Sequence, residues 1–160
     1  MSATIDESGC TPERAGAMPL DADEVYPGIW VGSVPFQKEA AAKWFTHIVL
    51  CAEQWQFPAS DFPGATVIHC PYEDDDSVMS GRTMALVFAT ARAVAEAREN
   101  AGKVLVTCAA GLNRSALVAG LAMVIGGVDG PDAVKMIREN RPGALYNSHF
   151  AKLLADLEGM

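Results

Sequence analysis

Residues 104–115 read Val104-Leu105-Val106-Thr107-Cys108-Ala109-Ala110-Gly111-Leu112-Asn113-Arg114-Ser115, and they predict a strand, a tight loop and a helix in direct succession. The apolar run before Cys108 is typical of a strand buried on both faces, and the apolar stretch after Arg114 is typical of a buried helix. Because a buried strand leads straight into a buried helix, this stretch predicts an α/β fold.

The loop between this strand and helix has the features of an oxyanion site. Successive backbone N–H groups of such a loop point inward, and the N-terminus of the following helix adds positive potential. The planar guanidinium of Arg114 can bind two oxygens of one phosphate group. The predicted phosphate-binding residues are therefore Ala109, Ala110, Gly111, Leu112, Asn113 and Arg114.

Cys108 lies at the start of the same loop and is the candidate nucleophile. The pKa of a free cysteine, about 8.5, falls to roughly 3.5–7.5 near a helix N-terminus or a cation. Ser115 can donate a hydrogen bond to the sulfur. A cysteine and an arginine six residues apart are weak evidence alone, because such pairs also arise by chance. The preceding strand, the glycine in the loop and the following helix make the pattern specific.

Other segments complete the predicted fold around this loop. Short β-prone runs bounded by Gly, Pro or polar residues predict strands at 29–32, 47–51, 65–68 and 103–107. Helical spacing of apolar residues predicts helices at 81–100, 114–125, 130–140 and 148–157. We expect a central, mostly parallel sheet flanked by helices. Residues 1–22 are small, polar and acidic, which predicts a flexible N-terminal arm before one domain at 23–160.

The composition excludes several classes of protein. The chain has 160 residues and a net charge of −8, which argues against a broad nucleic-acid-binding surface. No run approaches the roughly 20 apolar residues of a membrane span, and the N-terminus lacks the order of a secretory signal. The four cysteines, Cys10, Cys51, Cys70 and Cys108, form no C-x-x-C pair and no metal-binding cluster with histidine. We expect free thiols, no metal and a cytoplasmic location.

Four segments together resemble a known family. Residues 107–116 resemble the signature loop, His-Cys-x5-Arg-Ser/Thr, of the cysteine-dependent dual-specificity protein phosphatases, which belong to the protein tyrosine phosphatase superfamily. Segments 26–33, 70–74 and 141–150 are similar, in the family's order, to its first hairpin, its apolar-Pro-x-x-Asp segment and its Arg-Pro…Asn-x-x-Phe element. Thr107 departs from the family's histidine, and its hydroxyl can instead hydrogen-bond to nearby backbone.

The resemblance implies a two-step hydrolysis of phosphomonoesters without a metal or other cofactor. Cys108 would attack the phosphorus, and a carboxylic acid would protonate the leaving oxygen. The same carboxylate would then activate the water that hydrolyses the cysteinyl-phosphate. Asp74 matches the family's acid by its place after Cys70-Pro71, with Asp75 and Asp76 as alternatives. The expected substrate is a phosphorylated protein, on tyrosine, serine or threonine, or a small phosphomonoester.

Other functions remain open from sequence alone. One is a phosphatase of phosphoinositides, nucleotides or RNA 5′ ends, although the loop has no Lys or Arg before Arg114 to bind a polyanionic head group. Another is a module that binds phosphate groups without turnover. Rhodanese-type sulfurtransferases and arsenate reductases share the Cys-to-Arg spacing but not the flanking segments. Asn147 is interpreted as a helix cap or brace, and Cys51 and Cys70 as small buried residues rather than disulfide partners of Cys108.

Overall fold

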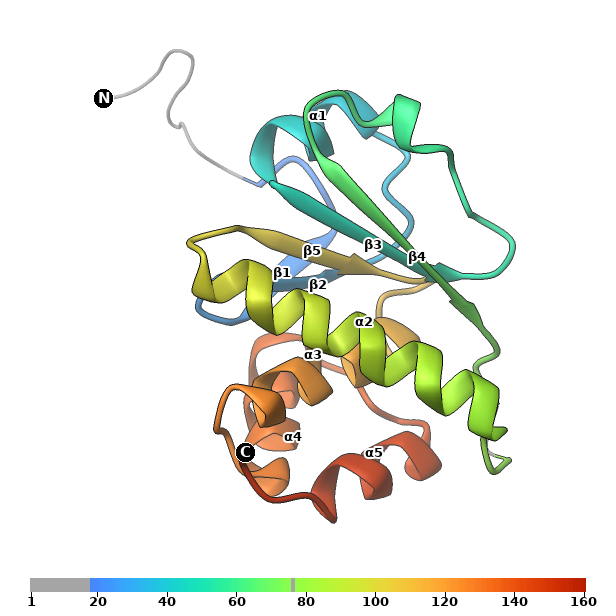
Figure 1. Ribbon diagram of the computed structural model, residues 1–160, viewed down its shortest axis with the longest axis vertical. Coiled ribbons are helices and arrows are strands. Elements are labelled where there is room, and N and C mark those ends of the chain that lie inside the picture. The colour runs from blue at the N-terminus through green and yellow to red at the C-terminus, as the bar shows by residue number, and fades with distance from the viewer. Residues whose placement is uncertain (1–17, 76) are drawn as a thin grey trace.

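The computed structural model describes residues 18–75 and 77–160, within which five strands form one sheet (Figure 1). The strands are β1 (Ala22–Tyr26), β2 (Ile29–Gly32), β3 (His47–Ala52), β4 (Thr66–Tyr72) and β5 (Val104–Thr107). Their order across the sheet is β1-β2-β5-β3-β4. The β1–β2 pair is antiparallel and the other three pairs are parallel. The mostly parallel sheet predicted from the apolar runs is confirmed.

Helices cover both faces of this sheet (Figure 1). The helices of the described residues are α1 (Lys38–Trp44), α2 (Gly81–Glu99), α3 (Arg114–Ile125), α4 (Gly130–Asn140) and α5 (Ser148–Ala155), with a short 3-10 turn at Ala59–Asp61. The four helices α2 to α5 lie on one face, and α1 lies on the other. None of the helices in the described ranges has the length and apolar character that a membrane crossing requires.

Each central strand contributes to two separate cores. In β3, Val49 and Cys51 pack into the large core beneath α2 and α3, whereas Ile48 and Leu50 pack into the smaller core beneath α1. This alternation follows from the period of two along a strand. Both faces are therefore apolar, which explains why the strand sequences are continuous apolar runs rather than alternating ones.

Several predicted boundaries need correction. Helix α2 ends one residue and α5 two residues earlier than predicted, while α3 and α4 have the predicted bounds. Strand β4 extends to Tyr72, beyond the predicted end at residue 68, because an edge strand tolerates Pro71 without a ladder hydrogen bond. Helix α1 was not predicted, since its seven residues are too few to establish a helical period.

The N-terminal boundary also differs from the sequence-based expectation. Residues 1–17 of the predicted arm lie outside the described residues. Strand β1 already begins at Ala22, and Met18 and Leu20 pack against the smaller core. Residues 18–22 are therefore part of the folded chain rather than of a flexible arm.

The sheet places the carboxyl ends of its parallel strands at one edge. Thr107, the last residue of β5, pairs with Gly32 at the end of β2 and with Leu50 near the end of β3. The segments that follow β2, β3, β4 and β5 therefore leave the sheet on the same side. The loop that starts at Cys108 leaves from the central strand of this edge, where open α/β sheets bind their ligands.

Candidate active site

The loop between β5 and α3 surrounds the sulfur of Cys108. This residue follows β5 directly, is 3% exposed, and its backbone N–H donates to the Gly32 carbonyl (3.2 Å). Its Sγ lies 3.2 Å from Oγ of Ser115, in the first turn of α3. The contact between sulfur and hydroxyl that the sequence suggested is therefore present.

The hydrogen bonds around Cys108 favour its thiolate form. Burial raises the pKa of the thiol because it removes water from the charged sulfur. The Ser115 hydroxyl and the backbone N–H groups of Ser115, Gly111 and Leu112 lower this pKa, and together they outweigh the effect of burial. The pKa of Cys108 consequently lies below that of an ordinary cysteine, in agreement with the low-pKa environment predicted for the loop.

Arg114 starts α3 and is buried beside Tyr72 at the end of β4. Its Nη1 donates to the Tyr72 carbonyl (3.2 Å), and the Tyr72 hydroxyl donates to the Arg114 carbonyl. Within the described residues, Nε of Arg114 is buried and has no hydrogen-bond partner. A buried N–H without an acceptor is energetically unfavourable. An acceptor supplied by a bound anion would remove this cost.

Asp74 is held at the loop by two asparagine side chains. Nδ2 of Asn113, in the loop, donates to Oδ2 of Asp74 (3.0 Å), and Nδ2 of Asn147 donates to Oδ1 (2.9 Å). The two asparagines also contact each other, because the backbone N–H of Asn147 donates to Oδ1 of Asn113 (2.9 Å). Both oxygens of the carboxylate are therefore fixed relative to the loop that contains Cys108.

Asn147 is both a helix cap and a brace, as predicted. Its Oδ1 accepts hydrogen bonds from the backbone N–H groups of His149 (3.0 Å) and Phe150 (3.2 Å) at the start of α5. Its Nδ2 also donates to the Asp75 carbonyl (2.8 Å), in addition to Asp74. One side chain thus links the start of α5 to the acidic segment after β4.

The neighbouring Asp75 has a different environment. Its carboxylate accepts hydrogen bonds from the backbone and hydroxyl of Ser77, and these hold the pKa of Asp75 below its usual value. Asp76, the third candidate acid, lies outside the described residues. Of the two described candidates, Asp74 is the one whose carboxylate contacts a side chain of the Cys108 loop.

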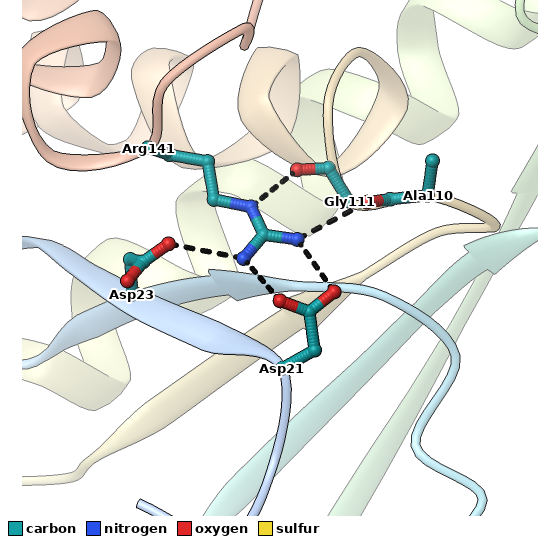
Figure 2. A network of polar contacts seen from close by, with 5 residues as sticks. All are labelled: Asp21, Asp23, Ala110, Gly111 and Arg141. Atoms are coloured by element: carbon teal, nitrogen blue, oxygen red, sulfur yellow. Dashed lines mark hydrogen bonds and ion pairs between the residues drawn. The ribbon is translucent and has the colours of Figure 1, made fainter.

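Arg141 is a site residue for which the sequence alone predicted no role. Figure 2 shows its guanidinium between β1 and the Cys108 loop. It donates from Nε to the Gly111 carbonyl (2.9 Å), from Nη2 to the Ala110 carbonyl (3.1 Å), and from Nη1 and Nη2 to the carboxylates of Asp21 and Asp23. The Arg-Pro element at 141–142 was the only sequence signal for this contact, and it did not indicate the partners.

Thr107 and the two other described cysteines near the loop are buried. Thr107 donates from Oγ1 to the Val49 carbonyl on β3 (2.8 Å), which confirms the expected backbone hydrogen bond. Cys51, Cys70 and Cys108 are all free thiols in the described part of the chain. Cys51 and Cys70 are buried in the large core. The fourth cysteine, Cys10, lies outside the described residues.

A mostly parallel sheet whose central strand leads through a Cys-to-Arg loop into a buried helix is typical of cysteine-based phosphatases. Residues 29–160 match the family model described as the dual specificity phosphatase catalytic domain. The chain belongs to this family.

Solved structures of the family share this fold. A mouse protein described as a dual specificity phosphatase, complexed with zinc tungstate, is 26% identical with a TM-score of 0.74 and 89% of each chain covered. Human DUSP28 is 26% identical with a TM-score of 0.73, over 88% of this chain and 94% of its own. OH1 from the Orf virus is 21% identical with a TM-score of 0.63, over 87% of each chain, and shows the fold alone. A comparison with curated proteins finds no match.

Proposed function

We propose that this phosphatase hydrolyses phosphotyrosine, phosphoserine and phosphothreonine in proteins through a cysteinyl-phosphate intermediate, without a metal. The observation that carries the proposal is the environment of Cys108. Its sulfur has a lowered pKa and lies among inward-facing N–H groups, next to an arginine whose buried Nε has no acceptor among the described residues. A phosphate dianion would accept hydrogen bonds from these donors while its phosphorus lies against the thiolate.

In the first step, the Cys108 thiolate attacks the phosphorus. An S–P bond forms and the ester P–O bond breaks, while the Asp74 carboxylic acid donates its proton to the leaving oxygen. The loop N–H groups and Arg114 stabilise the charge on the three non-bridging oxygens, a role that Mg²⁺ fills in many other phosphoryl transfers. When Asp74 is protonated, one of its oxygens is the hydroxyl that donates the proton, and the other still accepts a hydrogen bond from an asparagine side chain, so the carboxyl group stays held at the loop.

In the second step, water hydrolyses the cysteinyl-phosphate. The Asp74 carboxylate accepts a proton from the water as its oxygen bonds to phosphorus, and the S–P bond breaks. The products are inorganic phosphate and the Cys108 thiolate. The Ser115 hydroxyl, 3.2 Å from the sulfur, stabilises the thiolate as it leaves. The step regenerates both the nucleophile and the protonated acid.

The surface around the site supports a protein substrate. Three exposed large apolar side chains of the described residues lie on loops near the carboxyl ends of the parallel strands. They are Phe36 after β2 (59% exposed), Val78 after β4 (83%) and Tyr146 just before α5 (70%). Such residues suit contacts with a polypeptide. Glu53, Glu73 and Asp75 line one cavity of this edge of the sheet, and none of the described residues that line it is a Lys or an Arg. We define these three carboxylates as the acidic rim. They disfavour polyanionic substrates such as phosphoinositides.

The test compares wild type with Cys108→Ser on phosphopeptides and on p-nitrophenyl phosphate in the presence of EDTA. We expect turnover by the wild type that EDTA does not affect and that vanadate inhibits. The Cys108→Ser variant should lose turnover yet retain vanadate binding, because a hydroxyl is a poor nucleophile while the loop persists. Activity of this variant within tenfold of wild type would overturn the mechanism. A clear preference for phosphoinositides over phosphopeptides would overturn the substrate class.

A further inference from the structure

We propose that Arg141, held by Asp21 and Asp23 of the N-terminal segment, is a positioning residue that orients two peptide groups of the phosphate-binding loop toward Cys108. The inference rests on the proposed function, because its consequence is a better nucleophile and oxyanion site. It assigns a role in the reaction to a part of the chain that precedes the family-matched residues 29–160.

The orientation follows from the planarity of the peptide bond. In a trans peptide the carbonyl and the N–H point in opposite directions. The Ala110 carbonyl belongs to the same peptide group as the Gly111 N–H, and the Gly111 carbonyl to the same group as the Leu112 N–H. Arg141 binds these two carbonyls (3.1 and 2.9 Å), and the N–H groups of the same two peptides are donors that lower the pKa of Cys108. Arg141 therefore faces the outer side of the two peptide groups whose inner side faces the sulfur.

The charge of Arg141 strengthens the same effect. A cation bound to a carbonyl polarises the peptide group, so its N–H becomes a stronger donor. A neutral donor in the same place would polarise the peptide group less. Arg141 is 5% exposed, and the five N–H groups of its guanidinium make five hydrogen bonds, two to the loop and three to carboxylates.

Asp21 and Asp23 make this buried cation stable in one orientation. Asp21 accepts from both Nη1 (2.9 Å) and Nη2 (3.1 Å), which is the two-point geometry typical of arginine and carboxylate, and Asp23 accepts from Nη1 (3.0 Å). The hydrogen bonds from Arg141 hold the pKa of Asp21 below its usual value against the opposing effect of burial, so Asp21 stays ionised at neutral pH. The two carboxylates fix the guanidinium plane, and the plane then fixes the loop carbonyls (Figure 2).

Glycine at position 111 is what allows this contact. Its φ of +72° lies in the left-handed region that favours glycine. A Cβ at this position would lie 2.6 Å from Nη2 of Arg141 and 2.4 Å from the carbonyl carbon of Gly32. The loop backbone thus packs against both Arg141 and the end of β2 with no space for a side chain.

The experiment measures the pKa of the Cys108 thiol and the affinity of the loop for vanadate, and neither measurement requires turnover. The pH dependence of iodoacetamide alkylation, read by mass spectrometry at the Cys108 peptide, reports the pKa of the thiol, and vanadate binding reports the oxyanion site. The variants are Arg141→Met, Arg141→Lys and the double variant Asp21→Asn/Asp23→Asn, in the full chain. Asp61→Asn is the matched control, because it removes a carboxylate bound to Lys38 (2.8 Å).

We expect Arg141→Met to raise the pKa of Cys108 and to weaken vanadate binding by about tenfold or more, with a larger fall in kcat than rise in KM. Arg141→Lys should recover part of each loss, since a lysine supplies the charge without the planar geometry. Asp21→Asn/Asp23→Asn should move both quantities in the same direction as Arg141→Met, and Asp61→Asn should move neither.

Two results would overturn the inference. One is a folded Arg141→Met variant with a lower melting temperature but an unchanged thiol pKa and vanadate affinity, which would make the contact purely structural. If Arg141→Met does not fold, the double variant decides, because Asp21 and Asp23 are largely exposed at 64% and 45%. The second result that would overturn the inference is an unchanged thiol pKa and vanadate affinity in the double variant. If the wild type shows no phosphatase activity but the variants still shift the pKa of Cys108 as expected, that result counts only against the proposed function.

Discussion

The side chain of Asn147 offers a sharp test of how Asp74 is held. We propose to replace Asn147 by serine, which keeps an oxygen that caps α5 but is too short to reach Asp74. The change removes the Nδ2 hydrogen bonds to Oδ1 of Asp74 (2.9 Å) and to the Asp75 carbonyl (2.8 Å). Because Ser and Asn are similar N-caps, we expect the melting temperature to change little. Alanine at the same position should cost about 1 kcal/mol through loss of the cap.

The expected loss of activity follows from the contacts that remain. A hydrogen bond to a charged group contributes about 1.5–3 kcal/mol. Asp74 is exposed and keeps the hydrogen bond from Asn113 (3.0 Å), so the lower end of this range applies. If Asp74 protonates the leaving oxygen, it becomes a carboxylate in the transition state, where this hydrogen bond is strongest, so about 1.5 kcal/mol corresponds to roughly a tenfold lower kcat.

The assay compares substrates that differ in their need for that proton. A phosphotyrosine peptide has a poor leaving group, whereas p-nitrophenyl phosphate has a good one. We expect the tenfold loss with the peptide and little loss with p-nitrophenyl phosphate. Asn140→Ser is the matched control, because the Asn140 amide binds a helix carbonyl (Met136, 2.8 Å) and should leave both rates unchanged. An equal loss on both substrates, or none on either, would refute the role assigned to Asn147.

Four further predictions concern the residues around the sulfur. Asp74→Asn should lower kcat by roughly 10²–10⁴ on phosphotyrosine substrates and flatten the basic limb of the kcat profile; an unchanged limb would place the acid elsewhere. Arg114→Lys should cost about 2–4 kcal/mol of transition-state stabilisation, measured as kcat/KM, and an unchanged value would show that its guanidinium does not bind phosphate. Ser115→Ala removes a hydrogen bond that lowers the pKa of Cys108, so the acidic limb of the kcat/KM profile should move to higher pH. Thr107→Val should cost about 1 kcal/mol in urea unfolding without moving that limb, since its hydroxyl faces β3 rather than the sulfur; a shifted limb would contradict this geometry.

Local sequence signals predicted the part of the site that lies on one short segment. Cys108 and Ser115 are seven residues apart across a single loop, so the strand before and the helix after are enough to bring them together. The bounds of α3 were predictable for the same reason, because its apolar run ends at Gly126-Gly127. Asp74 was found through its family-like place after Cys70-Pro71, and a role for it remains a prediction.

Contacts between distant segments were not predictable in this way. Arg141 and Asp21 are 120 residues apart, and they meet because α4 packs against β1. Asn147 and Asp74 are 73 residues apart. No periodicity or spacing in the sequence encodes such pairs, since they depend on how the layers of the fold are placed. The same limitation explains why residues 18–22 were assigned to the arm, although Asp21 lies at the site.

The acidic rim also bears on how fast a substrate reaches the loop. A chain with a net charge of −8 and carboxylates beside its site repels dianions at long range and attracts cationic peptides. This effect acts on the association rate rather than on the bound complex. At 0.1 M salt the Debye length is about 10 Å, so added salt weakens both the attraction and the repulsion. If phosphopeptides are the substrates, we therefore expect discrimination between basic and acidic phosphopeptides to be greatest at low ionic strength and to narrow as salt increases.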